Sequence, residues 1–452
     1  MVTNMPLQPT RLSPAALQEN FADIAPALTD NEAAIEASRC LFCYDAPCIS
    51  ACPTHIDVPK FIRQIMERDI KGSARTILSA NIFGGACARA CPTEVLCEGA
   101  CVLNGLNEKP IQIGRLQRYA TDYAMHNDIQ LFKKAPAIGK KVAIIGAGPA
   151  GLSCAHELAK HGVEGIVFEA RSIIGGLNTY GIAGYKMTTE FALAEVEYIR
   201  KIGIDIRTNT PVGKDLPVTK LLAEYDAVFL GVGLGSTADL GIEGEDLEGC
   251  LEAMEFIIPT RLKKLEECVI GDHVLVIGAG NTAIDVATAA VRLGASSVTI
   301  VYRRSEKEMP AFKYEYNLAK SDNVKFLWHT VPRRIVGTNG KVSGLECHQV
   351  KAAGDNKLAP IPGSERVISC DMVVKALGQD ALYDLYKSIP GLQVENKKVV
   401  VDPQTGATSV KGLFAGGDCI NGGGEVVDAV EHGKVAARGM LRYLSEATGA
   451  SS

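Results

Sequence analysis

The chain has 452 residues, of which 47% are hydrophobic and 22% charged, with a formal net charge of −5. This length predicts roughly two to four domains with room for buried cores. There is no basic run, no stretch of about 18 apolar residues and no apolar signal-peptide core, which argues against nucleic acid, a membrane span and export. We therefore expect a cytoplasmic protein whose thiols stay reduced.

Cysteines are concentrated near the N-terminus, where eight of the fourteen lie between Cys40 and Cys101. The two runs are Cys40-x2-Cys43-x4-Cys48-x3-Cys52-Pro53 and Cys87-x3-Cys91-Pro92-x4-Cys97-x3-Cys101. Before them we expect an extended arm over residues 1–29 and a helix after Asp30. Between them we expect helices that begin near Asp57 and Ser73.

Thiolate runs of this kind suit either structural zinc or iron–sulfur clusters. Zinc usually takes paired CxxC knuckles, and the chain has only one CxxC. Two close runs of four cysteines, each with a Cys-Pro step, favour iron–sulfur clusters that draw ligands from both runs. A disulfide framework is a weaker alternative in a reducing compartment.

A dinucleotide-binding pattern follows over residues 140–170. An apolar strand at 142–145 leads into Gly146-Ala-Gly148-Pro149-Ala150-Gly151 and a helix, and a strand at 165–168 ends in Glu169. The three glycines make the turn, admit a pyrophosphate and let helix and strand pack closely. The phosphates are expected over the helix N-terminus, with the ribose hydroxyls on Glu169.

Two other glycine-rich stretches are interpreted as parts of the same cofactor site. Gly175-Gly176-Leu177 lets the chain pass close to a flat ring or to phosphates, although an ordinary loop is the alternative. Near the C-terminus, Gly417-Asp418 ends a strand and precedes a glycine run and a helix over about 425–444. Asp418 is placed to hydrogen-bond a flavin ribityl chain, and the helix N-terminus to face the ring or phosphates.

The dinucleotide pattern then repeats. A strand at 274–277 leads into Gly278-Ala-Gly280-Asn281-Thr282-Ala283, in which alanine replaces the third glycine. The next strand, at 298–302, ends in Arg303-Arg304 with no acid in place, which suits a 2′-phosphate and hence NADPH. Surface ion pairs with Glu306 and Glu308 are the alternative role for both arginines.

The order of these motifs predicts an α/β protein with two Rossmann-like nucleotide-binding domains, one inserted in the other, behind a helical iron–sulfur domain. The expected boundaries are 1–130 for the helical domain with two clusters, 131–260 plus 375–452 for the FAD domain, and 261–374 for the NAD(P) domain.

GAGPAG with Glu169, GAGNTA with Arg303-Arg304, and AGGD in this order resemble the glutathione-reductase-like flavoproteins. With the eight-cysteine domain, residues 30–445 resemble the glutamate-synthase small-subunit type. That group includes the glutamate synthase β subunit and the electron-input half of dihydropyrimidine dehydrogenase. The second is the nearer match, because Ile113-Gly-Arg-Leu-Gln117 is similar to its IG-x-LQ stretch with a ligand glutamine, where glutamate synthases usually carry glutamate.

The resemblance implies one FAD, one nicotinamide nucleotide and two [4Fe–4S] clusters. It implies these cluster ligands: Cys40, Cys43, Cys48 and Cys101 for the first, and Cys52, Cys91, Cys97 and Gln117 for the second, with Cys87 in place of Gln117 as the alternative. It implies these FAD contacts: Gly146, Gly148, Pro149, Ala150, Gly151, Glu169, Gly176, Leu177, Lys186, Gly417, Asp418 and Val426. It implies these NAD(P) contacts: Gly278, Gly280, Asn281, Thr282, Arg303, Arg304, Ala376 and Gly378.

Two departures from the family pattern matter. Ala183 stands where proline is usual before the basic Lys186. Pro310 stands where the NADPH-specific enzyme carries a further arginine, and the bacterial two-subunit pyrimidine reductases that the chain most resembles use NADH. We therefore expect NADH. No side chain is expected to be catalytic, because hydride passes from the nicotinamide to flavin N5 by stacking.

The expected function is electron input to a dihydropyrimidine dehydrogenase, from NADH through FAD and two clusters to a partner. The chain has no motif for FMN and no third cluster run, so uracil or thymine should be reduced on a subunit with FMN and further clusters, in a heterodimer or heterotetramer. The alternatives are a glutamate synthase small subunit and a ferredoxin or sulfide:NAD(P) oxidoreductase. A disulfide reductase would need a CxxC beside the flavin, and Cys154 and Cys419 stand alone.

Overall fold

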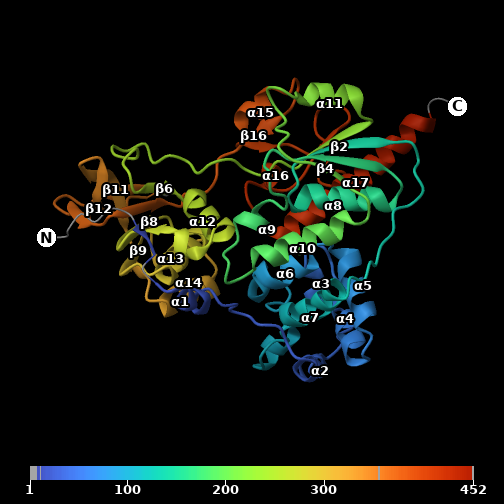
Figure 1. Ribbon diagram of the computed structural model, residues 1–452, viewed down its shortest axis with the longest axis horizontal. Helices are drawn as coiled ribbons and strands as arrows, with labels where there is room; N and C mark the ends of the chain where they lie inside the picture. The colour runs from blue at the N-terminus through green and yellow to red at the C-terminus, as the bar shows by residue number, and fades with distance from the viewer. Residues whose placement is uncertain (1–7, 11, 355–356, 450–452) are drawn as a thin grey trace. The chain divides into compact units, whose positions relative to one another are not determined.

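The computed structural model describes residues 8–10, 12–354 and 357–449 (Figure 1). It separates into two compact units. Unit 1 holds the chain up to Asp23, Tyr180–Tyr185 and Ser236–Asp380, and unit 2 holds Ile24–Thr179, Lys186–Gly235 and the chain from Ala381. The segment up to Asp23 thus groups with unit 1 and not with the cysteine-bearing helices that follow it, which the sequence did not indicate.

The cysteine-bearing part of unit 2 is helical. Its elements are α2 (Asp30–Ser38), α3 (Pro47–Ser50), α4 (Val58–Met66), α5 (Ile70–Ala80), α6 (Gly84–Ala90), the 3-10 turns η1 (Thr93–Val95) and η2 (Val102–Leu106), and α7 (Ile113–His126). α4 begins as expected, with Asp57 accepting from the amide of Lys60. The expected start of α5 at Ser73 is wrong: Asp69 caps the amide of Gly72, so the helix begins at Ile70.

The rest of unit 2 is a parallel sheet with helices packed on it. The strands run in the order β18 (Leu413–Ala415), β5 (Ala227–Leu230), β2 (Lys141–Ile145), β3 (Glu164–Phe168) and β4 (Asp205–Arg207). Strand β2 is buried from Val142 onward. Its continuous apolar run is typical of a parallel strand that is covered on both faces. The accompanying helices are α8 (Pro149–Lys160), α9 (Leu177–Tyr180), α10 (Thr189–Arg200), α11 (Val218–Glu224), α15 (Tyr383–Lys387), α16 (Asp418–Asn421) and α17 (Val426–Gly449), with a β16 (Val394–Glu395) to β17 (Lys398–Val399) ribbon.

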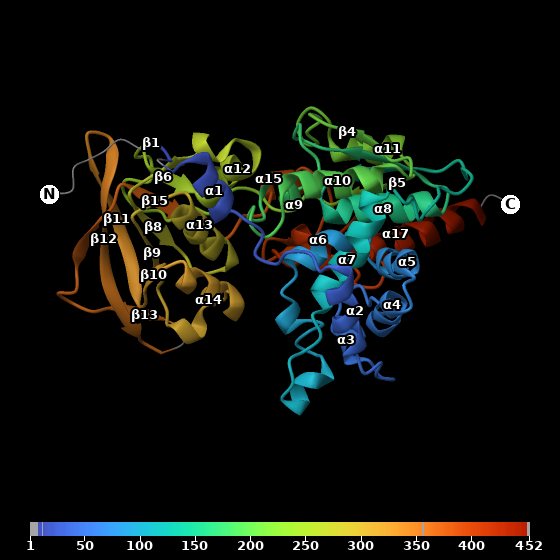
Figure 2. The same cartoon turned by 60° about the horizontal axis from the view of Figure 1, so that its bottom comes forward.

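Helices α8 and α17 pack against each other, and α6 and α7 lie against α10 (Figure 2). The α8–α17 contact is close because Gly433 has no side chain: a Cβ there would lie 2.2 Å from the carbonyl oxygen of Ala150. The cysteine-bearing helices and the β2 sheet therefore form one continuous unit.

Unit 1 repeats the parallel architecture. Its sheet has the order β10 (Lys325–Leu327), β9 (Ser297–Val301), β8 (His273–Ile277), β15 (Met372–Lys375) and β6 (Cys250–Glu252). Its helices are α12 (Ala253–Leu262), α13 (Asn281–Arg292) and α14 (Lys313–Ser321), with the 3-10 turns η3 (Leu265–Glu267) and η4 (Glu306–Glu308). An antiparallel sheet joins β11 (Thr330–Thr338), β12 (Lys341–Ala352), β13 (Leu358–Pro360) and β14 (Arg366–Ser369).

The N-terminal segment completes the core of unit 1. Strand β1 (Gln8–Pro9) pairs with β7 (Val269–Ile270), and α1 (Pro14–Asn20) follows it. Leu17 is fully buried in the cluster formed by α12, α13 and the sheet. Asn20 donates to the carbonyl oxygen of Arg292 at 2.9 Å. The described part of the expected arm is therefore partly helical; up to Asp23 it belongs to unit 1, whereas Ile24 onward belongs to unit 2, and residues 1–7 and 11 lie outside the described residues.

Each parallel sheet has one point where the strand order reverses, between β2 and β5 in unit 2 and between β8 and β15 in unit 1. Open parallel sheets bind ligands in the crevice at the carboxyl ends of the strands on either side of this point. Both predicted glycine turns lie there, directly after β2 and β8.

Candidate functional site

Four cysteines of the first predicted ligand set line one cavity: Cys40, Cys43, Cys48 and Cys101. Apolar side chains complete its wall, among them Val58, Ile62, Leu103, Ile111 and Ile113. Burial raises the pKa of the Cys48 thiol to about 11, and the sulfurs of Cys40 and Cys101 add to the effect. A buried thiol ionises when a bound cation neutralises the negative charge of the thiolate. The four sulfurs therefore fit an iron–sulfur cluster.

Three sulfurs of the second predicted set influence one another. Burial raises the pKa of the Cys97 thiol, and Glu98 and the sulfur of Cys52 add to the effect. The neighbouring thiol of Cys87 and burial raise the pKa of the Cys91 thiol, with a smaller contribution from Cys97. Gln117, 6% exposed on α7, donates from Nε2 to the carbonyl oxygen of Gly84 at 2.7 Å. A carbonyl can only accept, so this bond fixes the amide orientation and makes Oε1 the atom available to a metal. The chemistry of these groups, thiol sulfurs and an amide oxygen, suits iron, and their sharing of a second cluster stays a prediction.

No three Cys, His, Asp or Glu side chains in the described ranges are close enough to share one metal ion. A [4Fe–4S] cluster does not need such a group, because each ligand binds a different iron. All fourteen cysteines are free thiols in the structure.

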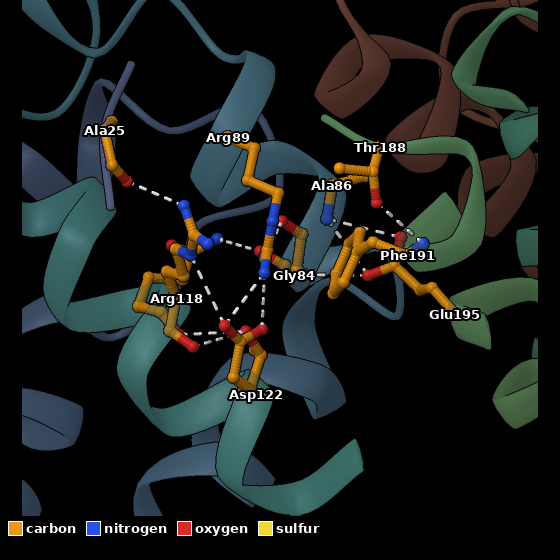
Figure 3. Close-up of polar contacts among 12 residues, drawn as sticks. Ala25, Gly84, Ala86, Arg89, Arg118, Asp122, Thr188, Phe191 and Glu195 are labelled. Carbon is orange, nitrogen blue, oxygen red and sulfur yellow. Dashed lines mark hydrogen bonds and ion pairs between the residues drawn. The ribbon is translucent and has the colours of Figure 1, made fainter. Parts of the chain in front are cut away.

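Helix α6, which ends at Cys91, is held by a buried carboxylate from α10. Glu195 is 1% exposed, and its Oε1 accepts from the amides of Gly85 at 2.8 Å and Ala86 at 3.0 Å (Figure 3). Burial raises the pKa of Glu195 to about 8, although the two amides and nearby Arg89 act to lower it. The first turn of α6 is thus tied to the α/β part of unit 2.

A buried ion pair fixes the other end of α6. Arg89 bonds both carboxylate oxygens of Asp122 on α7 at 2.8 Å, and its guanidinium carbon lies 3.4 Å from the ring centroid of Phe191 (Figure 3). Arg118 adds a 3.3 Å contact to the same carboxylate. Two helices that carry predicted ligands, α6 and α7, are therefore cross-linked beside α10.

The first glycine turn has the shape of a phosphate cradle. Gly146 has a φ of +101°, and a Cβ there would lie 2.4 Å from the carbonyl oxygen of Gly231 after β5. A Cβ on Gly151 would lie 2.0 Å from the carbonyl oxygen of Gly146. At Gly148 the nearest atom to an added Cβ is 3.9 Å away, on Gly176. Two glycines are thus required by packing, and Gly148 borders open space above Pro149 and Ala150 at the start of α8.

The polar residues predicted around this cradle lie in unit 2. Glu169 is 8% exposed and accepts from the amides of Ala147 at 2.8 Å and Arg171 at 2.9 Å, so its carboxylate faces the glycine turn. Asp418 accepts from the amide of Gly424 at 3.1 Å, and burial raises its pKa. The remaining predicted residues are Gly176 and Leu177 at the start of α9, the buried Lys186, Gly417 before α16, and Val426 at the start of α17.

The second glycine turn, in unit 1, has the same construction. Gly278 has a φ of +123°, and a Cβ there would lie 2.2 Å from the carbonyl oxygen of Ala376 after β15. Gly280 has no atom within 4 Å of an added Cβ. Asn281 accepts from the amide of Phe312 at 3.0 Å. The predicted neighbours Thr282, at the start of α13, and Gly378, after β15, lie at this same end of the sheet.

Beyond β9, the two arginines differ. Arg304 is paired with Glu308 at 3.7 Å, whereas Arg303 is exposed and has no ion pair among the described residues. Glu306 contacts Lys313 at 3.4 Å. The alternative that both arginines serve as surface ion pairs therefore holds for Arg304 alone, and Arg303 is available to a nucleotide phosphate.

Comparison with known proteins agrees with this arrangement. Residues 17–129 match the family described as dihydropyrimidine dehydrogenase domain II, 4Fe-4S cluster, and residues 140–433 match pyridine nucleotide-disulphide oxidoreductase. The chain belongs to the pyridine nucleotide-disulphide oxidoreductase family. As a member with an iron–sulfur domain, it is an NAD(P)-dependent flavoprotein oxidoreductase with FAD and 4Fe–4S chemistry, and the predicted family and fold class are confirmed.

Two relatives within this oxidoreductase family are similar over nearly their whole length. The glutamate synthase [NADPH] small chain of Escherichia coli (strain K12) is 34% identical over 94% of both chains. The NAD-dependent dihydropyrimidine dehydrogenase subunit PreT of the same strain is 35% identical over 95% of this chain and 99% of that one. Among solved structures, FprA from Mycobacterium tuberculosis superposes with a TM-score of 0.58 at 19% identity, over 70% of this chain and 86% of that one, which shows the fold alone.

Several residues of this oxidoreductase's site were not anticipated. Arg89, Asp122 and Glu195 lie in ordinary helical patterns, and nothing in their spacing distinguishes them from surface residues. The one available signal for Glu195 was an acidic residue within the apolar stretch FALAEVEYI, where a carboxylate on a buried helix face requires a partner. Among the described residues, no helix is both long enough and apolar enough to cross a bilayer.

Proposed function

We propose that the chain is the electron-input subunit of a dihydropyrimidine dehydrogenase, oxidising NADH and delivering electrons through two [4Fe–4S] clusters to a partner subunit. In this proposal the partner carries FMN and further clusters and reduces uracil or thymine, in a heterodimer or heterotetramer. The names of the relatives support a partner subunit for this chain, since each relative is a chain or subunit of a larger enzyme.

The observation that carries the proposal is Gln117. It is buried on α7, and its amide nitrogen donates to the carbonyl oxygen of Gly84, which leaves the amide oxygen as the acceptor atom. In the proposed second cluster this oxygen is the fourth ligand, beside Cys52, Cys91 and Cys97. The dihydropyrimidine dehydrogenase resemblance implies glutamine at this position, and the glutamate synthase resemblance implies glutamate. The relatives alone do not discriminate, because their identities are 35% and 34%.

In the proposed roles, the cradle around Gly148 holds the pyrophosphate of FAD, with Glu169 on the ribose, Asp418 on the ribityl chain and the α17 terminus near the phosphates. Bound FAD supplies the conversion of a two-electron hydride into single electrons. The turn at Gly278–Ala283 holds the nicotinamide nucleotide. The chain itself orients both cofactors and provides no acid–base group.

NADPH is the second candidate for the electron donor, and a specific observation favours it. Arg303 is exposed and unpaired among the described residues at the end of β9, where a 2′-phosphate would lie. A glutamate synthase role would be consistent with NADPH, given the name of that relative.

The test is to co-express the chain with the product of the neighbouring gene and to follow NADH and NADPH oxidation with uracil, thymine, or 2-oxoglutarate plus glutamine. Uracil- or thymine-dependent oxidation that needs both chains supports the proposal. Formation of glutamate would overturn it. A preparation that contains zinc and lacks acid-labile sulfide would overturn the cluster assignment.

A further inference from the structure

The peptide group that joins Gly84 to Gly85 is hydrogen-bonded by buried side chains of two other helices. Its carbonyl oxygen accepts from Nε2 of Gln117 on α7 at 2.7 Å. Its N–H donates to Oε1 of Glu195 on α10 at 2.8 Å. The C=O and N–H of a trans peptide point in opposite directions, so the two side chains lie on opposite sides of this one group.

The first turn of α6 depends on Glu195 for an acceptor. The N-cap residue, Phe83, makes no side-chain bond to the turn. Glu195 instead extends from α10, and its Oε1 accepts from the amides of Gly85 and Ala86 (Figure 3). The first N–H groups of a helix have no partner within the helix, so a buried first turn needs such an acceptor. A Cβ on Gly84 or Gly85 would lie 2.6 Å from a side chain of α5 or α10, so the turn is closely packed on both sides.

We propose that Glu195 determines which atom of Gln117 is available to the second predicted cluster. Because Glu195 accepts from the Gly85 N–H, the Gly84 carbonyl is directed toward α7, where it can bond only the donor end of the Gln117 amide. The amide oxygen, the end that can bind iron, is left free of this bond. The inference rests on the proposed function, in which Gln117 is a cluster ligand. Glu195 is thus a positioning residue that acts through Gln117.

The experiment compares the cluster-loaded full chain with Glu195→Leu, Glu195→Gln and Gln117→Ala, by electron paramagnetic resonance and by iron release to a chelator. Glu195→Leu removes the acceptor and should change the spectrum of one cluster as Gln117→Ala does. Its iron should be released at about tenfold lower chelator concentration, since outer-shell changes cost roughly 10–100-fold in metal affinity. Glu195→Gln keeps an oxygen acceptor and should retain the wild-type spectrum. Glu197→Leu, which replaces an exposed carboxylate on the same helix, should match the wild type in both measurements.

A folded Glu195→Leu protein with the wild-type spectrum would overturn the inference, and so would a Glu195→Gln protein that shares the Gln117→Ala spectrum. A wild-type spectrum in Gln117→Ala would overturn it too, because Glu195 would then have no ligand to position. Spin-echo spectroscopy of wild-type protein with isotopically labelled nitrogen in its glutamine side chains needs no variant. The label should couple weakly, as in an amide bound through oxygen, and the strong coupling of a bound nitrogen would contradict the proposal. A wild-type protein without iron and sulfide would instead refute the proposed function.

Discussion

The Oε1 atom of Glu195 lies 2.8 Å from the amide nitrogen of Gly85. This bond connects α10, which packs beside the β2 sheet, to the first turn of the helix that ends at Cys91. The predicted flavin cradle and the second predicted ligand set lie in the same unit, so a residue that fixes α6 against α10 also fixes the separation between them.

The carboxyl of Glu195 should make stability depend on pH. Its pKa is about 8 in the folded chain against an ordinary 4.5, mainly because of burial. The folded state therefore binds more protons than the unfolded state between these values, so this contribution to stability is complete below about pH 4.5 and is lost as the pH rises through about 8. The thermal midpoint of unfolding should fall from about pH 6 to about pH 9, and Glu195→Gln should flatten the fall.

A matched control for this prediction is Glu197→Gln, two residues away on α10 and paired with Arg200 at the surface. Its pKa is lowered by the hydrogen bond to Arg200, so it stays ionised over this range. Glu197→Gln should leave the slope of the midpoint against pH unchanged. Equal slopes for the wild type and Glu195→Gln would show that Glu195 does not titrate in this range.

The ion pair of Arg89 with Asp122 should be needed for folding, because Asp122→Asn leaves a guanidinium with 6% side-chain exposure beside a neutral amide. Breaking a buried pair on one side costs roughly 3–5 kcal/mol of unfolding free energy. Asp128→Asn is the control, since Asp128 pairs with Lys201 at 2.7 Å in solvent. Chemical unfolding should show a large loss of unfolding free energy for Asp122→Asn and no measurable loss for Asp128→Asn.

Much of the architecture could be predicted because its signals are local. The turns at Gly146 and Gly278 have positive φ and face a carbonyl oxygen across the sheet, which only glycine tolerates, so the motif and the geometry coincide. The predicted start of α5 at Ser73 is wrong because the cap is Asp69, four residues upstream, and aspartate and serine both cap helices.

The contacts that join distant segments could not be predicted. The bonds of Glu195 join residues 109 and 110 positions apart. Leu17 lies in the core of unit 1, although the sequence suggested only an extended arm. A single sequence contains no periodicity that encodes such pairings, since they depend on how helices pack and not on their spacing.

Arg303 and Arg304 should determine the response to the two nucleotides. If NADH is the donor, as proposed, Arg303→Ala should change kcat/KM for NADH by less than about threefold, whereas any activity with NADPH should fall at least about tenfold, or about 1.4 kcal/mol. Arg304→Ala should have the smaller effect, because Arg304 already contacts Glu308. The measurement is steady-state oxidation of each nucleotide with an artificial acceptor. A wild-type preference for NADPH would contradict the NADH assignment.

Alanine at Gly148 and alanine at Gly151 should have different effects, the first on FAD binding and the second on stability. Gly148 has a φ of −83° and open space where a Cβ would lie, so Gly148→Ala should fold normally. If a pyrophosphate occupies that space, the added methyl group should weaken FAD binding, measured as flavin retained after gel filtration. A Cβ on Gly151 would lie 2.0 Å from the carbonyl oxygen of Gly146, so Gly151→Ala should lower the thermal midpoint even of flavin-free protein. Full flavin content in Gly148→Ala would place the phosphates elsewhere.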